Sequence, residues 1–204
     1  RDLAVGAVLM NDAVATAARP QAAGVGGLIL PYKGAWPGIG KDVFVAPNAT
    51  VIGNVSIGAN SSVWFNVLIR GDDHWIKIGE RTNLQDGTVV HISKDTAPTF
   101  IGSDVTIGHG CIIHGCTLED GCMVGIGAIV LDGAIVEKGA IVGAGAVVPP
   151  GKRVSAGEMW AGCPAKKVRD VRPEEFGHLT RNAVHYCGLA GEYLKMRRAL
   201  VPGM

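Results

Sequence analysis

The chain has 204 residues and a formal net charge of +1, a balance that gives no reason to expect nucleic acid or an acidic polymer as a partner. Its length suits one domain with appendages, and no uninterrupted apolar run is long enough to cross a membrane. The five cysteines include no C-x-x-C pair, so we expect Cys111 and Cys122 to be reduced core residues in a reducing compartment.

Residues 1–23 form an Ala-rich N-terminal extension that stands outside the pattern of the rest of the chain. Apolar residues such as Leu3, Val5 and Val8 would give one face of a short helix, and a disordered tail is the alternative. The sequence begins with Arg1 rather than Met, which fits a processed precursor. An artefact or an incomplete sequence explains the same observation equally simply.

A hydrophobic residue recurs every six positions between residues 39 and 159. This period matches neither a helix nor a simple strand and is typical of a parallel β-helix built from hexapeptides. Three hexads make one triangular coil, and the first residue of each hexad points into the prism. We therefore predict an all-β fold with a β-helix domain over residues 24–164, in which residues 24–38 cap the first coil. The inward register comprises Ile39, Val45, Val51, Ile57, Val63, Ile69, Ile78, Leu84, Val90, Ile101, Ile107, Ile113, Leu118, Val124, Val130, Val136, Val142, Val148 and Val154.

The register is interrupted twice. The step from Ile69 to Ile78 is nine residues, which predicts a bulge within residues 70–75, and the step from Val90 to Ile101 is eleven, which predicts a loop over residues 93–99. Insertions in a solenoid emerge on its outside, where functional sites are usually built.

Residues 165–204 are predicted to form a C-terminal α-helix and tail. Pro173 followed by Glu174 and Glu175 suits a first helical turn. Three glycines weaken the helix, so we expect it to depend on packing against a face of the prism. Its apolar stripe comprises Phe176, Leu179, Ala183, Tyr186, Ala190 and Tyr193.

The hexad count predicts a ladder of side chains on one outer face of the prism. Ile69, Val90 and Ile113 stack in successive coils, and the residue after each of them points outward. These outward residues are Arg70, His91 and His114. The two histidines are one coil apart, close enough to share a metal ion.

A third histidine, His109, lies on the next face by the same count. Leu84 and Ile107 stack there, which puts Asp86 beside His109. Because His109 cannot easily reach the ladder of its own prism, a neighbouring subunit is the better source of this ligand. Three histidines with a fourth position open form the ligand set of a catalytic zinc site.

Four segments of the chain resemble the γ-class carbonic anhydrases. The resemblance covers about residues 28–198 and implies the left-handed form of the β-helix. It also implies a homotrimer, or a heterotrimer with γ-carbonic-anhydrase-like paralogues, with zinc at the subunit interfaces. His91 and His114 of one chain would bind zinc (Zn2+, with Fe2+ also suited to imidazole) together with His109 of the next chain. The four segments are Arg70-Gly71-Asp72, residues 82–91, Ile107-Gly108-His109 and residues 114–120.

The activity implied by this resemblance is the reversible hydration of CO2 to bicarbonate by a zinc-bound hydroxide. Gln85 matches the residue that orients the hydroxide or CO2, and Arg70 matches an arginine that pairs with Asp72 and Asp86 across the interface. The chain departs from the family in its short segment 92–98, where active members carry a longer acidic loop with a proton-transferring Glu. The site residues implied in this way are Arg70, Asp72, Asn83, Gln85, Asp86 and, as a weaker match, Tyr186.

The resemblance leaves a second role open. Similar γ-class homologues form a structural domain on the matrix side of mitochondrial respiratory complex I, with weak or no catalysis, and the extension and terminal helix of this chain fit that assembly role. A cytoplasmic protein is the alternative, since bacterial relatives have similar cores. Acyl transfer is a third hypothesis, because many hexapeptide proteins bind coenzyme A, but those transferases commonly rely on one catalytic histidine.

Overall fold

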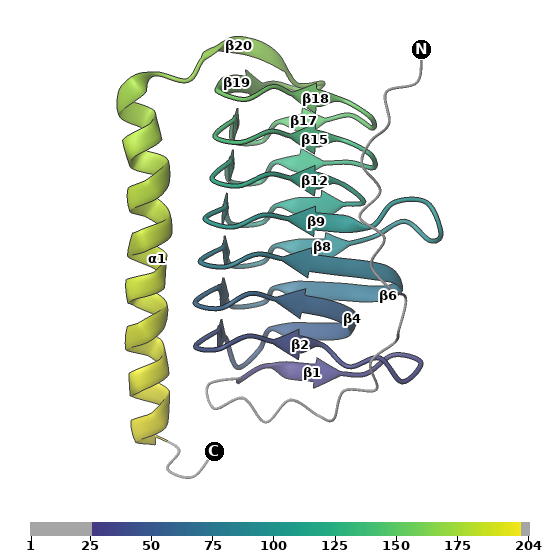
Figure 1. The fold of residues 1–204 in the computed structure, drawn as a ribbon, viewed down its shortest axis with the longest axis vertical. Coiled ribbons are helices and arrows are strands. Elements are labelled where there is room, and N and C mark those ends of the chain that lie inside the picture. The colour runs from purple at the N-terminus through teal and green to yellow at the C-terminus, as the bar shows by residue number, and fades with distance from the viewer. Residues whose placement is uncertain (1–25, 201–204) are drawn as a thin grey trace.

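The computed structural model describes residues 26–200, apart from the side chains of residues 198–200, so the extension predicted over residues 1–23 lies outside the described part of the chain. The described residues form a parallel β-helix followed by one long helix, α1 (Pro173–Leu200), as Figure 1 shows. The predicted fold class is therefore confirmed. No helix in this part of the chain combines the length and hydropathy that crossing a membrane requires.

The core is a single column of aliphatic side chains inside the prism. The inward hexad residues from Val45 to Val154 are buried, most of them with no exposed surface, and Ile39 in the first coil is partly buried. Cys111 and Cys122 are buried free thiols, and burial raises the pKa of the Cys111 thiol to about 11. The hydrophobic period therefore marks the core, since every sixth side chain is removed from water.

One face of the prism, called here the helix-covered face, is the eight-stranded sheet. Its strands pair in parallel, except that β20 runs antiparallel to β19 across the last coil. The sequence did not predict β20, which covers a sheet edge that would otherwise be unpaired. The strands of this sheet are β3 (Phe44–Val45), β5 (Ser62–Val63), β7 (Asn83–Leu84), β10 (Thr106–Ile107), β13 (Met123–Val124), β16 (Ile141–Val142), β19 (Glu158–Ala161) and β20 (Lys166–Asp170).

The other two faces belong to one twelve-stranded sheet, because β4 (Thr50–Ile57) and β6 (Leu68–Ile78) run through the corner between them. The first part of β6 pairs with β8, and its last part pairs with β9. We call the face that contains β8 the His91 face. Beyond β6 it contains β8 (Val89–His91), β11 (Ile112–His114), β14 (Ile129–Val130) and β17 (Val147–Val148). The third face contains β9 (Thr99–Ile101), β12 (Thr117–Leu118), β15 (Ile135–Val136) and β18 (Arg153–Val154).

Both interruptions of the register are present in the structure. The residues inserted after Ile69 stay within β6, whose pairing with β4 shifts register between Gly53 and Val55, so this insertion is a β-bulge rather than a separate loop. The second insertion is a tight turn closed by bridging of Ser93 with Ala97. The first coil is capped by β1 (Leu28–Leu30) and β2 (Gly38–Ile39), both paired with β4.

The helix α1 runs back along the helix-covered face and contacts β3, β5, β7 and β10 (Figure 1). Its residues Leu179, Ala183, Ala190 and Leu194 are at most 6% exposed. The half-buried rings of Tyr186 and Tyr193 pack against Trp64. The predicted apolar stripe therefore faces the prism, although Phe176 in its first turn remains 43% exposed.

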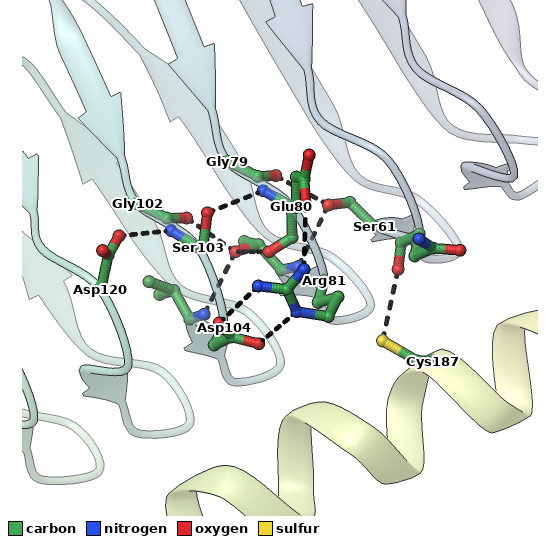
Figure 2. Close-up of polar contacts among 12 residues, drawn as sticks. Ser61, Gly79, Glu80, Arg81, Gly102, Ser103, Asp104, Asp120 and Cys187 are labelled. Carbon is green, nitrogen blue, oxygen red and sulfur yellow. Dashed lines mark hydrogen bonds and ion pairs between the residues drawn. The ribbon is translucent and has the colours of Figure 1, made fainter.

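The corner of the prism beside α1 is held by polar contacts between successive coils, which Figure 2 shows. Arg81 forms a two-point ion pair with Asp104 one coil further on, at 2.7 Å and 2.9 Å. Ser61 donates to the carbonyl of Gly79 at 2.8 Å. Because each contact joins neighbouring coils, and Arg81 and Asp104 occupy equivalent positions of them, the corner helps to keep the coils in register.

Candidate metal centre at a corner of the prism

Two histidines face each other on the outside of the His91 face. The parallel pairing of β8 with β11 aligns His91 with His114, and both side chains follow inward residues, so the pleat directs them outward. His91 Nδ1 and His114 Nε2 are 3.1 Å apart. The predicted ladder therefore brings two imidazole nitrogens close together.

Each of these histidines has its other ring nitrogen against a carboxylate. His91 Nε2 lies 3.1 Å from Asp72 Oδ1, and His114 Nδ1 lies 2.5 Å from Asp132 Oδ1. Burial works against ionisation of Asp72, but hydrogen bonds from His91 and Arg70 outweigh it and hold the pKa of this carboxyl below its usual range. Asp132 behaves similarly, because hydrogen bonds from Ser93 and His114 outweigh burial and lower its pKa. Both carboxyls are therefore ionised acceptors for imidazole N–H groups.

These contacts fit a metal ion between the two rings. If the carboxylates take the N–H groups, the two facing nitrogens both carry lone pairs and cannot hydrogen-bond to each other. Two nitrogen ligands at the zinc–nitrogen bond length in a tetrahedral site would be about 3.3 Å apart. The observed 3.1 Å is close to that separation. A carboxylate on the remote nitrogen is also the usual partner of a metal-binding histidine.

The third predicted ligand, His109, lies elsewhere in the chain. It follows β10 on the helix-covered face, where its Nδ1 is 2.8 Å from Asp86 Oδ2, and its side chain is 46% exposed. Within residues 26–200 of one chain, no three His, Cys, Asp or Glu side chains gather into a site that could hold a metal ion. The three predicted ligands are therefore not brought together within one described chain, although His109 contacts a carboxylate in the same way as the other two histidines.

The remaining predicted site residues divide between the two faces. Arg70 forms an ion pair with Asp72 beside His91, and within the described chain it makes no contact with Asp86. Asn83 and Gln85 lie on the helix-covered face and are 1% and 5% exposed. Their carboxamides hydrogen-bond to each other at 3.1 Å.

Tyr186 reaches the helix-covered face from α1. Its ring packs edge-on against Trp64, with the ring centroids 5.6 Å apart. Burial, with a smaller contribution from the negative charge of Asp86, raises the pKa of its hydroxyl. The structure thus groups Tyr186 with Asn83, Gln85, Asp86 and His109, and groups Arg70 and Asp72 with His91 and His114.

Asp132 was missed in the sequence, although a signal was present. Val130 pairs with Ile113 in the next coil, so continuing the ladder by one coil leads to Leu131 above His114 and then to Asp132. The hydroxyl of Ser93 also hydrogen-bonds to Asp132. Ser93 lies at the start of the inserted turn, where the six-residue period is interrupted and so does not predict its contacts.

Comparisons with known proteins agree with this fold. The family model "Bacterial transferase hexapeptide (six repeats)" matches residues 37–71. The mitochondrial gamma carbonic anhydrase 2 of Arabidopsis thaliana is 48% identical over 159 residues, which are 76% of this chain and 57% of that protein. The probable carbonic anhydrase of Methanocaldococcus jannaschii is 49% identical over 152 residues, covering 74% of this chain and 95% of that protein. A solved structure, a putative acetyltransferase from Bacillus cereus, has a TM-score of 0.82 at 36% identity and covers 84% of this chain and 99% of that one.

The fold, the repeat and the family match define a hexapeptide-repeat protein. Within that class, the two carbonic anhydrases are nearly half identical to this chain, and the chain covers 95% of the Methanocaldococcus jannaschii protein. The chain belongs to the γ-class carbonic anhydrase family. It spans less than two thirds of the length of the Arabidopsis thaliana relative, 57%.

Proposed function

We propose that the protein is a zinc-dependent carbonic anhydrase that interconverts CO2 and bicarbonate at sites shared between the subunits of a trimer. The observation that supports this most strongly is the common arrangement of the three histidines. Each has one ring nitrogen against an aspartate, at 3.1 Å, 2.5 Å and 2.8 Å for His91, His114 and His109. This arrangement leaves each histidine one nitrogen with a lone pair for a metal ion.

The metal ion, Zn2+ or the alternative Fe2+, would be held by His91 and His114 of one chain and His109 of the next. A bound zinc ion supplies a Lewis acid that lowers the pKa of water to about 7 and so provides hydroxide at neutral pH. The assignment of His109 to a neighbour rests on its position beyond the corner of the prism from the other two histidines. The assembly would be a homotrimer, or a heterotrimer with related chains.

The other residues would position and stabilise the reactants. Gln85 would orient the attacking water or CO2 through its carboxamide, and Asn83 would hold that carboxamide. Hydrogen bonds from His91 and Arg70 hold the pKa of Asp72 below its usual range, so Arg70 would help to keep the N–H of His91 engaged. Tyr186 lies near Asp86 and would border the site from α1.

Proton removal has few candidate groups in the described chain. The inserted turn at residues 92–98 contains one acid, Asp95, whose φ of 56° belongs to the tight turn. Asp73, an acid within the bulge of β6, lies 3.6 Å from Lys33. We therefore propose that zinc binding is secure and that proton transfer limits turnover.

The location proposed for the protein is the mitochondrion, because a relative with 48% identity is named mitochondrial. The structural role in respiratory complex I stays a prediction from the sequence, and it is compatible with a retained metal site. Acyl transfer remains a weaker alternative, since the similar Bacillus cereus protein is named a putative acetyltransferase.

The test is stopped-flow CO2 hydration by purified, zinc-loaded protein beside a His91→Ala variant, with metal content measured for both. We expect activity and bound zinc in the wild type and the loss of both in the variant. Trimers that bind zinc but do not hydrate CO2 would contradict the enzymatic role and favour the structural one. Wild-type protein that binds no metal would contradict the metal site itself.

A further inference from the structure

Three polar side chains are buried beneath α1 on what would otherwise be the exterior of the prism. Asn83 and Gln85 flank the inward residue Leu84, and Thr106 precedes the inward Ile107, so the pleat directs all three outward. Their exposures are 1%, 5% and 2%, because α1 covers this face. Burying an amide or a hydroxyl group costs free energy unless the group is hydrogen-bonded. These three side chains should therefore have defined hydrogen-bond partners.

The hydrogen bonds among these side chains have a defined direction. Asn83 Nδ2 faces the backbone carbonyl of Val105 at 3.4 Å and donates to Thr106 Oγ1 at 2.9 Å. A carbonyl can only accept, so the NH2 group of Asn83 must lie on this side. Asn182 of α1 donates to the same Thr106 Oγ1 at 3.3 Å and occupies its second lone pair.

The orientation of Asn83 fixes that of Gln85. With its NH2 group toward Thr106, Asn83 presents Oδ1 to Gln85, whose Nε2 donates to it at 3.1 Å. Gln85 Oε1 therefore points away from Asn83 and accepts no hydrogen bond from the described residues of this chain. If Asn83 were reversed, Gln85 would also have to reverse and would present a donor instead of an acceptor.

We infer that Thr106 and Asn182 are positioning residues that hold the Gln85 carboxamide, through Asn83, with its Oε1 acceptor directed outward to the reacting water. The inference rests on the proposed function for the identity of the reactant, whereas the orientation itself rests on the hydrogen bonds alone. It makes α1 part of the site, because Asn182 belongs to α1 and Gln85 lies at the end of β7.

The orientation is testable by NMR without any activity, because the chain has only two glutamines, Gln21 and Gln85. Protein labelled with [side-chain 15N]glutamine gives two NH2 signals, and Gln85→Glu identifies the signal of Gln85 by removing it. In the wild type we expect the Gln85 amide protons to exchange slowly with solvent. Thr106→Val keeps the shape but removes the acceptor, so the Gln85 signal should shift and its protons should exchange faster, whereas Thr106→Ser should restore both. A Gln85 signal unchanged in Thr106→Val would overturn the inference.

The kinetic consequence is tested with the same variants. We expect Thr106→Val to lower kcat for CO2 hydration about 10-fold to 100-fold through misplacement of Gln85, with KM and zinc content little changed. Asn182→Leu should lower kcat less, and Thr106→Ser should recover it. The matched control is Thr82→Val, which removes another buried threonine hydroxyl that bonds to the backbone carbonyl of Gly102 at 2.8 Å.

Equal losses of activity in Thr106→Val and Thr82→Val would reduce Thr106 to a structural role and overturn the inference. If the wild type itself hydrates no CO2, the proposed function fails, and the NMR experiment, with Asn182→Leu recorded beside Thr106→Val, still decides whether Thr106 and Asn182 orient Gln85. The two failures are therefore distinguishable.

Discussion

At the candidate centre, the carboxylate of Asp132 determines which nitrogen of His114 is free to bind a metal ion. Its Oδ1 lies 2.5 Å from His114 Nδ1, which leaves Nε2 toward His91. Hydrogen bonds from Ser93 and His114 keep Asp132 ionised despite partial burial. The residue would thus act on a metal ion bound at His114 through the ring it holds, without touching the ion itself.

Replacing Asp132 by Asn should weaken zinc binding while leaving the fold intact. An amide is a poorer acceptor than a carboxylate and can present an NH2 group to Nδ1, which would favour the wrong tautomer of His114. We expect the zinc affinity to fall about 10-fold to 100-fold, measured by competition with a chelator. Asp120→Asn is the control, since Asp120 caps a backbone N–H at another turn, at 2.7 Å from Ser103. Equal affinity in Asp132→Asn and wild type would show that the contact does not tune the metal.

Single residues were predictable from the sequence where the repeat fixed their position. Counting hexads identified His91 and His114 as neighbours and placed Asp86 against His109, because register alone determines such contacts. The hydrogen bond from Asn182 to Thr106 joins residues 76 positions apart, and no periodicity relates a residue of the helix to a residue of the prism. Contacts of that kind depend on how α1 docks, which the sequence pattern does not specify.

The start of α1 is held by one acidic side chain in its first turn. Glu175 accepts two hydrogen bonds from Arg169 at 2.6 Å and 2.8 Å, and one from the backbone N–H of Arg172 at 2.8 Å. The contact with Arg172 resembles the reciprocal half of a capping box, in which an N3 glutamate satisfies the N-cap N–H. The hydrogen bonds from Arg169, followed by the one from Arg172, lower the pKa of Glu175 to about 2.

This pKa predicts how the stability of the helix start depends on pH. Because the folded-state pKa lies below the ordinary value of 4.5, the stabilisation from Glu175 is present above pH 4.5 and is lost as the pH falls toward 2. Glu175→Gln should therefore lower Tm at neutral pH, and the difference from wild type should shrink as the pH falls through this window. Thermal melts followed by circular dichroism would measure it, with Glu174→Gln as the control for loss of one charge in the same turn. A difference in Tm that is constant across this pH range would contradict the assignment.

Elements with a strong period were predictable, and elements defined only by their neighbours were not. The hexads marked the strands of the prism, and Pro173 with two acids marked the start of α1. By contrast, β20 follows the last coil and has no period of its own, because it forms by antiparallel pairing with β19. The insertion after Ile69 was visible as a nine-residue step, but its accommodation inside the continuous strand β6 depends on pairing with β4.

For the whole molecule, the proposed sharing of the metal centre between chains leads to a quantitative expectation. His91→Ala and His109→Ala each remove a different ligand, so each variant alone should lack activity and bound zinc. In a trimer that contains both variants, one interface combines His91 and His114 from one chain with His109 from the other and is complete. Random co-assembly in equal amounts should therefore restore about a quarter of the wild-type sites.

The mixed sample should be made by denaturing and refolding the two variants together, and then assayed for CO2 hydration and zinc content. A mixture of His91→Ala with His114→Ala is the control, because both variants lack a ligand from the same group and cannot complement each other. Failure of the first mixture to recover zinc, despite verified mixed trimers, would contradict the sharing of the centre between His109 of one chain and His91 and His114 of another.

The return of α1 along the prism has a consequence for how the molecule opens. In a stack of coils each coil touches only its neighbours, so such a molecule can fray from either end. The first turn of α1 lies over the late coils, where Phe176 meets Gly139, and its later turns contact β3 of the first full coil (Figure 1). Unfolding of either end of the stack therefore removes contacts of α1, the helix that also packs on the other end. The stack should consequently melt as one cooperative unit. Asn182 belongs to α1 and hydrogen-bonds to Thr106. The hydrogen bonds that orient Gln85 are therefore protected from the local unfolding that repeat proteins ordinarily undergo.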